Sequence, residues 1–187
     1  VTDDKFPWEA FNSLGYHCEV FGQKAYNGVA ILTKEKPGKV TFGFDQPLWD
    51  QQKRLMHCQV GNVTVVNVYA PHGDVRGSEK YTYKQGWYEF FLKYLQNNFS
   101  PKDALVVVGD FNVALGNLDV HDPKLLEDTV CTMPEERHWL QQVLGWGLID
   151  TFRHLSPNEQ AFTWWDYIGG AIWQNKGMRI DYIFCTD

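Results

Sequence analysis

A carboxylate and an amide stand together directly after a continuous apolar run. The run covers residues 104–108, and the tetrapeptide Gly-Asp-Phe-Asn follows it at 109–112. Side chains two residues apart on extended backbone point to the same side, so Asp110 and Asn112 can present their polar groups together beyond a strand end. Ligand crevices of α/β folds favour such ends. Taken alone, the tetrapeptide fits an ordinary turn slightly better, because Asp and Asn often bond to their own backbone.

Two further polar side chains occupy comparable positions. Tyr69 ends an apolar segment, while Asp181 is embedded in the sequence Arg-Ile-Asp-Tyr-Ile-Phe at 179–184. A lone carboxylate among apolar residues needs a partner, since its desolvation is otherwise costly. Each has a simple structural explanation: a surface hydroxyl for Tyr69, and pairing with Arg179 or the capping of a turn for Asp181. Several polar groups at different strand ends are better explained by a shared site.

The chemistry that suits this set is metal-assisted hydrolysis of a phosphate ester. The sequence shows neither a Ser–His–Asp pattern nor a cysteine in a nucleophilic context. A hard cation such as Mg²⁺, for which Mn²⁺ can substitute, takes oxygen ligands and polarises a phosphoryl oxygen. Asp110 can orient or deprotonate the attacking water, and Asn112 and Tyr69 can donate hydrogen bonds to the developing charge.

Composition narrows the class of protein that can carry this site. The chain has 187 residues, 44% of them hydrophobic and 21% charged, which predicts one globular domain with a sizeable core. No apolar run approaches the roughly 18–20 residues of a membrane span. The net charge of −6 argues against nucleic-acid binding by bulk electrostatics and leaves room for a local basic groove. The four widely spaced cysteines are expected to be reduced thiols, which favours an intracellular origin.

The elements that must position the site follow from residue periodicity. A helix tail is expected over residues 1–15, ending at Gly15. Alternating and apolar segments predict strands at 16–21, 29–35, 39–44, 55–60 and 63–70, the last two joined by Gly-Asn at 61–62, a strong hairpin signal.

Two helices interrupt the strands of the second half. Aromatic and apolar residues recur at three and four positions from Trp87 to Leu95, which predicts an amphipathic helix. A capping box over 132–135 opens a second helix, which stops at Gly145 or Gly147. Strands are expected at 104–108, 161–165 and 179–185. This order predicts an α/β sandwich of mixed sheets with helices packed outside.

Aromatic and basic residues near the chain's end suggest contacts with nucleic acid. Adjacent residues on a strand face opposite ways, so one of Trp164 and Trp165 is core and the other is a candidate stacking platform. We expect Trp165 to point inward. Basic side chains that could follow phosphates are Arg54, Lys80, Lys84, Lys176 and Arg179, although scattered surface Lys and Arg usually serve solubility.

Together these segments resemble a known family. The matching stretches, in order and spacing, are NVYAPHG (67–73), GDFN (109–112), LGWGLIDTFRH (144–154), FTWWDY (162–167) and GMRIDYIF (177–184). They resemble exodeoxyribonuclease III and the class II apurinic/apyrimidinic endonucleases of the endonuclease/exonuclease/phosphatase superfamily. The opening 1–35 is similar to the bacterial exodeoxyribonuclease III branch, which implies a cytoplasmic location. GDFN is shared across that superfamily, whereas the tryptophan-rich and RIDYIF segments are more specific to the DNA-repair branch.

The resemblance implies a four-layer α/β sandwich of two packed mixed sheets and a DNA-repair nuclease with 3′–5′ exonuclease and abasic-site endonuclease activities. It implies double-stranded DNA with abasic sites or 3′ ends as the partner, and we expect a monomer. Tyr69, Asp110 and Asn112 resemble the family's catalytic tyrosine, aspartate and asparagine, and Asp181 the aspartate that orients a catalytic histidine. By the same resemblance, Asp110 and Asn112 are expected next to the metal.

A second set of residues is expected at the DNA. Trp164, Met178 and Ile180 fall where the family lines its pocket for a flipped-out abasic sugar, and Met178 stands where some relatives carry tryptophan. His72 and Arg179 complete the expected DNA-binding set.

The resemblance also predicts that the chain is an internal part of its parent, truncated at both ends. Val1 lies just beyond the place of the family's Gln-Glu-Thr-Lys stretch, which carries a metal-binding glutamate, and Asp187 precedes the place of its Ser-Asp-His. Residues 1–187 by themselves are therefore expected to be inactive.

Two alternatives remain at this point. A superfamily phosphodiesterase or phosphatase acting on a lipid or small phosphate ester would keep Asp110, Asn112 and Asp181 without needing the FTWWDY pocket. A non-catalytic DNA-binding relative would lack the flanking glutamate and histidine.

Overall fold

The computed structural model describes residues 1–187 and shows two compact units that alternate along the chain. The first unit comprises Val1–Tyr69 and Asp103–Gly109, and the second comprises Ala70–Lys102 and Asp110–Asp187. The chain therefore passes between the units within the Gly-Asp-Phe-Asn tetrapeptide, after Gly109. That the chain forms one domain stays a prediction.

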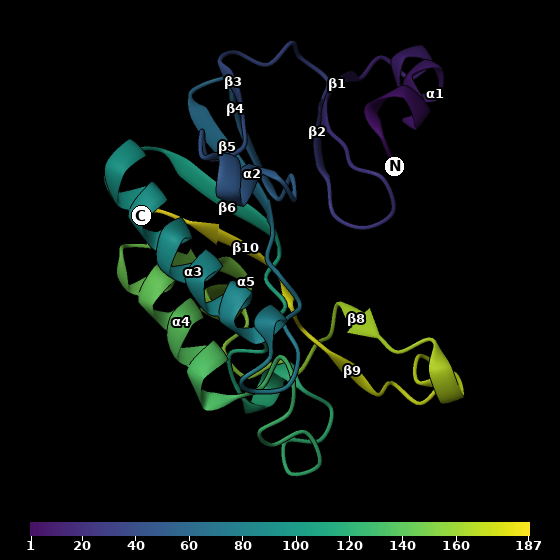
Figure 1. Ribbon diagram of the computed structural model, residues 1–187, viewed down its shortest axis with the longest axis vertical. Coiled ribbons are helices and arrows are strands. Elements are labelled where there is room, and N and C mark those ends of the chain that lie inside the picture. The colour runs from purple at the N-terminus through teal and green to yellow at the C-terminus, as the bar shows by residue number, and fades with distance from the viewer. The chain divides into compact units, whose positions relative to one another are not determined.

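The first unit is built on strands (Figure 1). An antiparallel pair, β1 (His17–Phe21) and β2 (Val29–Thr33), accompanies strands in the order β3 (Val40–Phe42), β4 (Leu55–Val60), β5 (Val63–Tyr69) and β6 (Leu105–Asp110), of which Leu105–Gly109 lie in this unit. The predicted hairpin is confirmed, because Val60 pairs with Val63 across a turn in which Gly61 has a φ of +59°. The 3₁₀ turn η1 (Asp3–Lys5) and the helices α1 (Trp8–Ser13) and α2 (Pro47–Asp50) complete the unit.

Two sheets pack against each other in this unit. Val29 and Ile31 of β2 form a buried cluster with Met56 and Cys58 of β4, and the ring of Tyr69 borders it. Burial of alternate strand residues provides the main stabilisation, at roughly 25 cal/mol per Å² of apolar surface.

The expected N-terminal helix is shorter than predicted. The chain forms η1 and α1 with Pro7 between them, at the N-cap of α1. Proline is tolerated at the start of a helix but interrupts one that runs through it, since it lacks an N–H. Gly15 lies beyond the helix end with a φ of +75°, as the stop signal predicts.

The second unit carries the two long helices. The helix α3 (Glu79–Asn98) lies beside α4 (Pro134–Gly145), and the ring centroids of Tyr81 and Trp139 are 5.3 Å apart (Figure 1). Its other elements are η2 (Asn117–Asp119), β7 (Ile149–Asp150), α5 (Thr151–Leu155), β8 (Trp164–Trp165), η3 (Ile168–Gly170), β9 (Gly177–Met178) and β10 (Asp181–Cys185). Strand β10 pairs antiparallel with β7, and β8 pairs antiparallel with β9.

The start of α4 differs from the predicted capping box. Met133 is the N-cap and Pro134 the first helical residue, and the Glu136 carboxylate accepts a hydrogen bond from the Met133 N–H at 3.3 Å. The Thr132 hydroxyl instead bonds within the preceding loop, to Thr129. The expected box is therefore displaced by one residue, because proline supplies the preorganised first position.

Two expected strands are also shorter. The segment expected at 161–165 is a strand only at its last two residues, and the one expected at 179–185 begins at Asp181. The N–H groups just before β10 bond elsewhere: that of Arg179 donates to the Asp119 carbonyl at 2.8 Å, and that of Ile180 to the Thr163 hydroxyl at 3.1 Å. No helix combines the length and the apolar character needed to cross a membrane.

Candidate functional site

Asp110 and Asn112 form a closed turn directly after β6. The Asn112 N–H donates to Oδ1 of Asp110 at 2.8 Å, and its side-chain amide donates to Oδ2 of Asp110 at 3.0 Å and to the Ala70 carbonyl at 2.9 Å. Asn112 is buried and has a φ of +51°, a left-handed conformation that asparagine tolerates well. An ordinary turn and a site that uses the Asp110 side chain are therefore compatible, because the hydrogen bonds of the turn orient the Asp110 carboxylate.

Gly109 allows the close approach of strands that precedes this turn. Its φ is +131°, and a Cβ there would lie 1.9 Å from the Val68 carbonyl oxygen. No side chain fits that distance, so the tetrapeptide requires glycine at its first position. The sequence offers only the glycine itself as a sign of this constraint.

The segment before β10 lies next to this turn in the second unit. The Phe111 N–H donates to the Ile180 carbonyl at 2.8 Å, so the backbone of Asp110–Asn112 borders the backbone that leads into Asp181. This bond joins the residue after Asp110 to the residue before Asp181. A site shared by the two carboxylates stays a prediction.

Asp181 keeps contact with solvent but is partly enclosed. Partial desolvation raises the pKa of its carboxyl, while a hydrogen bond with the Thr163 side chain acts in the opposite direction. The Thr163 hydroxyl also accepts the Asp181 N–H at 3.1 Å. Asp181 makes no ion pair with Arg179, so that simple structural explanation for its presence does not hold.

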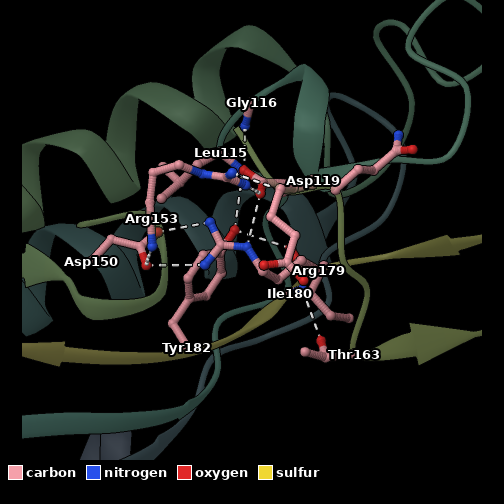
Figure 2. A network of polar contacts seen from close by, with 12 residues as sticks. Leu115, Gly116, Asp119, Asp150, Arg153, Thr163, Arg179, Ile180 and Tyr182 are labelled. Carbon is pink, nitrogen blue, oxygen red and sulfur yellow. Dashed lines mark hydrogen bonds and ion pairs between the residues drawn. The ribbon is translucent and has the colours of Figure 1, made fainter. Parts of the chain in front are cut away.

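Arg179 belongs instead to a buried network of charges (Figure 2). Its Nε donates to Oδ1 of Asp119 at 2.8 Å, and its two terminal nitrogens bind the two oxygens of Asp150 at 3.0 and 2.7 Å. Burial acts to lower the pKa of Arg179, but the hydrogen bonds to both carboxylates outweigh it, so the pKa is raised. Because only 3% of Arg179 is exposed, this placement corrects the expectation that its guanidinium contacts DNA.

The same network fixes the backbone on both sides of the site. Asp119 also binds Arg153 at 2.7 Å and accepts the Gly116 N–H at 2.8 Å (Figure 2). The buried Tyr182 hydroxyl lies 2.8 Å from the Val113 carbonyl, just beyond the Asp110 turn. Rigid support of this kind is what a catalytic carboxylate needs to keep its orientation.

Tyr69 lies at the end of β5 in the first unit, where Arg54 supports it. The Tyr69 carbonyl accepts a hydrogen bond from Arg54 at 2.9 Å, and the guanidinium carbon lies 4.9 Å from the ring centroid. Arg54 is only 8% exposed and also bonds the Gln52 side chain at 2.8 Å. Arg54 is therefore a supporting residue rather than a surface cation that follows phosphates.

The residues expected at the DNA differ in exposure. Trp164 is 38% exposed, and it pairs across the β8–β9 ladder with Met178, which is half-buried. Ile180 is 4% exposed and belongs to a buried cluster that includes Val120, so almost none of its surface is open to DNA. His72 is exposed, in the loop after the first unit.

Trp165 does not reach the main core, contrary to expectation. It is half-buried, packs edge-to-face on Phe162 with centroids 6.4 Å apart, and donates a hydrogen bond to Asn175 at 3.3 Å. The strand β8 is too short and too peripheral within this unit to send a side chain into the central cluster.

The turn provides oxygen atoms suited to a hard cation. Both hydrogens of the Asn112 amide are engaged, so the atom that this side chain has left to offer is Oδ1, and the Asp110 carboxylate adds two more oxygens. A donor role for Asn112 would require one of these bonds to break. No group of three or more His, Cys, Asp and Glu side chains gathers as a complete metal site. Mg²⁺ commonly binds one or two carboxylates and completes its shell with water and phosphate oxygens, so the residues present fit a partial magnesium shell.

A strand-end turn that offers oxygen ligands, with a second carboxylate on β10, is the arrangement expected of a metal-assisted phosphoesterase with an α/β fold. The chain belongs to the endonuclease/exonuclease/phosphatase family, whose model matches residues 1–187. It is 35% identical to exodeoxyribonuclease III of Haemophilus influenzae over 198 aligned positions, which cover 100% of this chain and 74% of the relative.

Solved structures give the same result. An AP endonuclease from Archaeoglobus fulgidus superposes with a TM-score of 0.94 at 38% identity, over 100% of this chain and 72% of the other. A 3′ phosphatase from Neisseria bound to a product DNA hairpin gives 0.92 at 34% identity, over 100% and 72%. The chain thus spans about three quarters of these relatives. The matches confirm the predicted family, the α/β fold class and a DNA-repair nuclease function, and they do not favour a lipid phosphoesterase.

Proposed function

We propose that the chain forms most of a Mg²⁺-dependent nuclease that hydrolyses phosphodiester bonds of double-stranded DNA at abasic sites and 3′ ends. The observation that carries the proposal is the Asp110–Asn112 turn, whose carboxylate accepts two hydrogen bonds from Asn112 at a strand end, while the same amide also donates to the Ala70 carbonyl. The relatives named above act in the same chemical class, and one of them was solved with DNA.

The protein's own residues divide the work of hydrolysis. Asp110 takes the proton of the attacking water or gives a proton to the leaving oxygen as one P–O bond forms and another breaks. Tyr69 contributes a hydroxyl that donates a hydrogen bond to the developing charge. Asp181 contributes a carboxylate that orients the family's catalytic histidine. Bound Mg²⁺, held in part by Asp110 and Asn112, would polarise the phosphoryl oxygen and offset its charge, and Mn²⁺ would serve in its place.

The DNA-facing residues in this proposal are His72, Trp164 and Met178. Trp164 offers an exposed aromatic face next to Met178 on the neighbouring strand, which suits a bare deoxyribose. An abasic nucleotide is the least costly to extrude, since it has no base to unpair. A monomeric state and a cytoplasmic location stay predictions, which size-exclusion chromatography and cell fractionation would test.

The experiment compares two aspartates that make the same kind of turn. In the full-length protein, Asp110→Asn should lower Mg²⁺-dependent cleavage of an abasic duplex by about 10²–10⁴-fold while DNA binding and melting stay close to wild type. Asp122→Asn is the matched control, because Asp122 also accepts a backbone N–H two residues on, at 3.0 Å, in an exposed loop. Activity of Asp110→Asn near that of Asp122→Asn would refute the assignment.

A further inference from the structure

A fully buried ion pair lies beneath the Asp110–Asn112 turn. Lys84 of α3 and Glu136 of α4 have no exposed side-chain surface, and Nζ lies 2.6 Å from Oε1. The Lys84 ammonium also donates to the Asn112 carbonyl at 2.8 Å and to the His72 carbonyl at 3.0 Å. All three of its hydrogens therefore have acceptors, and two of these acceptors are backbone atoms of predicted site residues.

Stability alone is a weak reason for such a pair. Burying two charges carries a desolvation penalty, and an apolar pair of similar volume is often as stable or more stable. Burial raises the pKa of Glu136, while the Lys84 ammonium and the Met133 N–H act in the opposite direction. The desolvation of two charges thus makes the pair unfavourable as a simple filling of the core. Its hydrogen bonds to the backbone give a better reason for its presence.

What they hold is the backbone of the site. Lys84 fixes the carbonyl of Asn112, whose own φ is +51°, and Tyr88, one turn further along α3, donates to the carbonyl of the preceding Phe111. The Lys84 stem lies so close to Gly73 that a Cβ there would sit 2.8 Å from Cδ. One side chain therefore ties the loop after Pro71 to the turn that orients Asp110.

We propose that Lys84 and Glu136 are positioning residues for phosphodiester hydrolysis, which hold the carbonyl of Asn112 so that the side chains of Asp110 and Asn112 keep their reactive orientation. The inference rests on the proposed function. Neither residue touches the substrate. The pair acts through the turn, so its loss should lower the rate of the chemical step more than the affinity for DNA.

The test removes the pair without leaving a lone buried charge. In the full-length protein, Lys84→Met with Glu136→Leu should lower kcat by about 10–100-fold, the range for residues that orient a metal or catalytic shell, with little change in KM for the abasic duplex. The Mg²⁺ concentration needed for half-maximal activity should rise. Lys93→Met is the matched control, because Lys93 lies on the same helix, α3, with an exposed side chain; it should leave kcat unchanged.

Each outcome decides the inference. If the double variant does not melt cooperatively, Lys84→Gln with Glu136→Gln, which keeps polar side chains without a buried charge but is too short at position 84 to hold all three acceptors, should show the same loss of kcat below its melting temperature. A folded double variant whose kcat equals that of Lys93→Met, or whose loss is confined to KM, overturns the positioning role alone. A wild-type protein that cleaves no DNA substrate overturns the proposed function instead.

Discussion

Two arginines make the same bonds in opposite environments, and this allows a sharp test of the buried network. Arg179 bridges Asp119 and Asp150 with its side chain 4% exposed. Arg76 likewise bridges two carboxylates, those of Asp128 and Glu135, but with its side chain 40% exposed. Replacing each arginine by methionine removes the guanidinium and keeps most of the apolar stem.

The expected loss follows from what remains after each substitution. Without Arg179, Asp119 keeps Arg153, whereas Asp150 keeps no cation and only the Arg153 N–H at 3.1 Å. Breaking a buried pair from one side costs roughly 3–5 kcal/mol, which for a chain of this size lowers Tm by roughly 6–20 °C. Removing Arg76 leaves two carboxylates in water, so we expect little change.

Urea unfolding followed by tryptophan fluorescence and by circular dichroism measures both effects. We also expect partial recovery when Arg179→Met is combined with Asp150→Asn, since Asp119 keeps Arg153 and no carboxylate then stays buried alone. Equal midpoints for Arg179→Met and Arg76→Met would refute the claim that burial sets the magnitude. So would a double variant less stable than the single one.

Three further outcomes follow from positions described above. Gly109→Ala should destabilise the fold by at least about 1–3 kcal/mol, because it forces a Cβ against the Val68 carbonyl at a positive φ; a thermal melt measures this. Asp181→Asn should raise stability at pH 7 and progressively less toward pH 4: the raised pKa of the folded carboxyl means that wild type loses stability as pH rises from the unfolded value through the folded one. A constant gain from pH 3 to 8 would contradict this. Trp164→Ala should lower abasic-site cleavage more than 3′-exonuclease activity, by about 1–3 kcal/mol in activation free energy, whereas Trp165→Ala should cost less stability than the roughly 3–5 kcal/mol of a core aromatic; equal kinetic losses on both substrates would argue against the role of Trp164.

The sequence predicted those parts of the structure that local pattern determines. The hairpin at Gly61 needed only a two-residue turn between apolar strands, and the strand before Asp110 only a β-branched run. The turn at Asp110 and Asn112 was predicted correctly as a strand-end feature because its bonds join neighbours in the chain. Turns and hydrogen bonds between neighbours in the chain can therefore be predicted from a single sequence.

The support beneath the site depends on partners that periodicity does not reveal. Arg179 and Lys84 were expected among the residues that follow phosphates, because a charge in a sequence is normally a surface feature. Arg179 instead binds Asp150, 29 residues away. One signal for Lys84 was present: it lies three residues before Trp87 and seven before Phe91, on the apolar face of α3. A charged residue on such a stripe indicates a buried pair, although not which carboxylate completes it.

The long reach of the Arg179 network has a consequence for how the protein comes to be folded. Its members are separated by up to 60 residues, and the guanidinium is supplied by the last of them. As the chain leaves the ribosome, Asp119 and Asp150 emerge well before Arg179, and only Asp119 has a second cation, Arg153. The segments that carry the two aspartates therefore cannot dock in their final form until the segment around residue 179 arrives. Contacts of such large sequence separation slow folding, because loop closure must precede them. The rate-limiting event in forming the site is therefore expected to be the late docking of the strand that carries Asp181, and translation that pauses before it would leave the earlier carboxylates exposed.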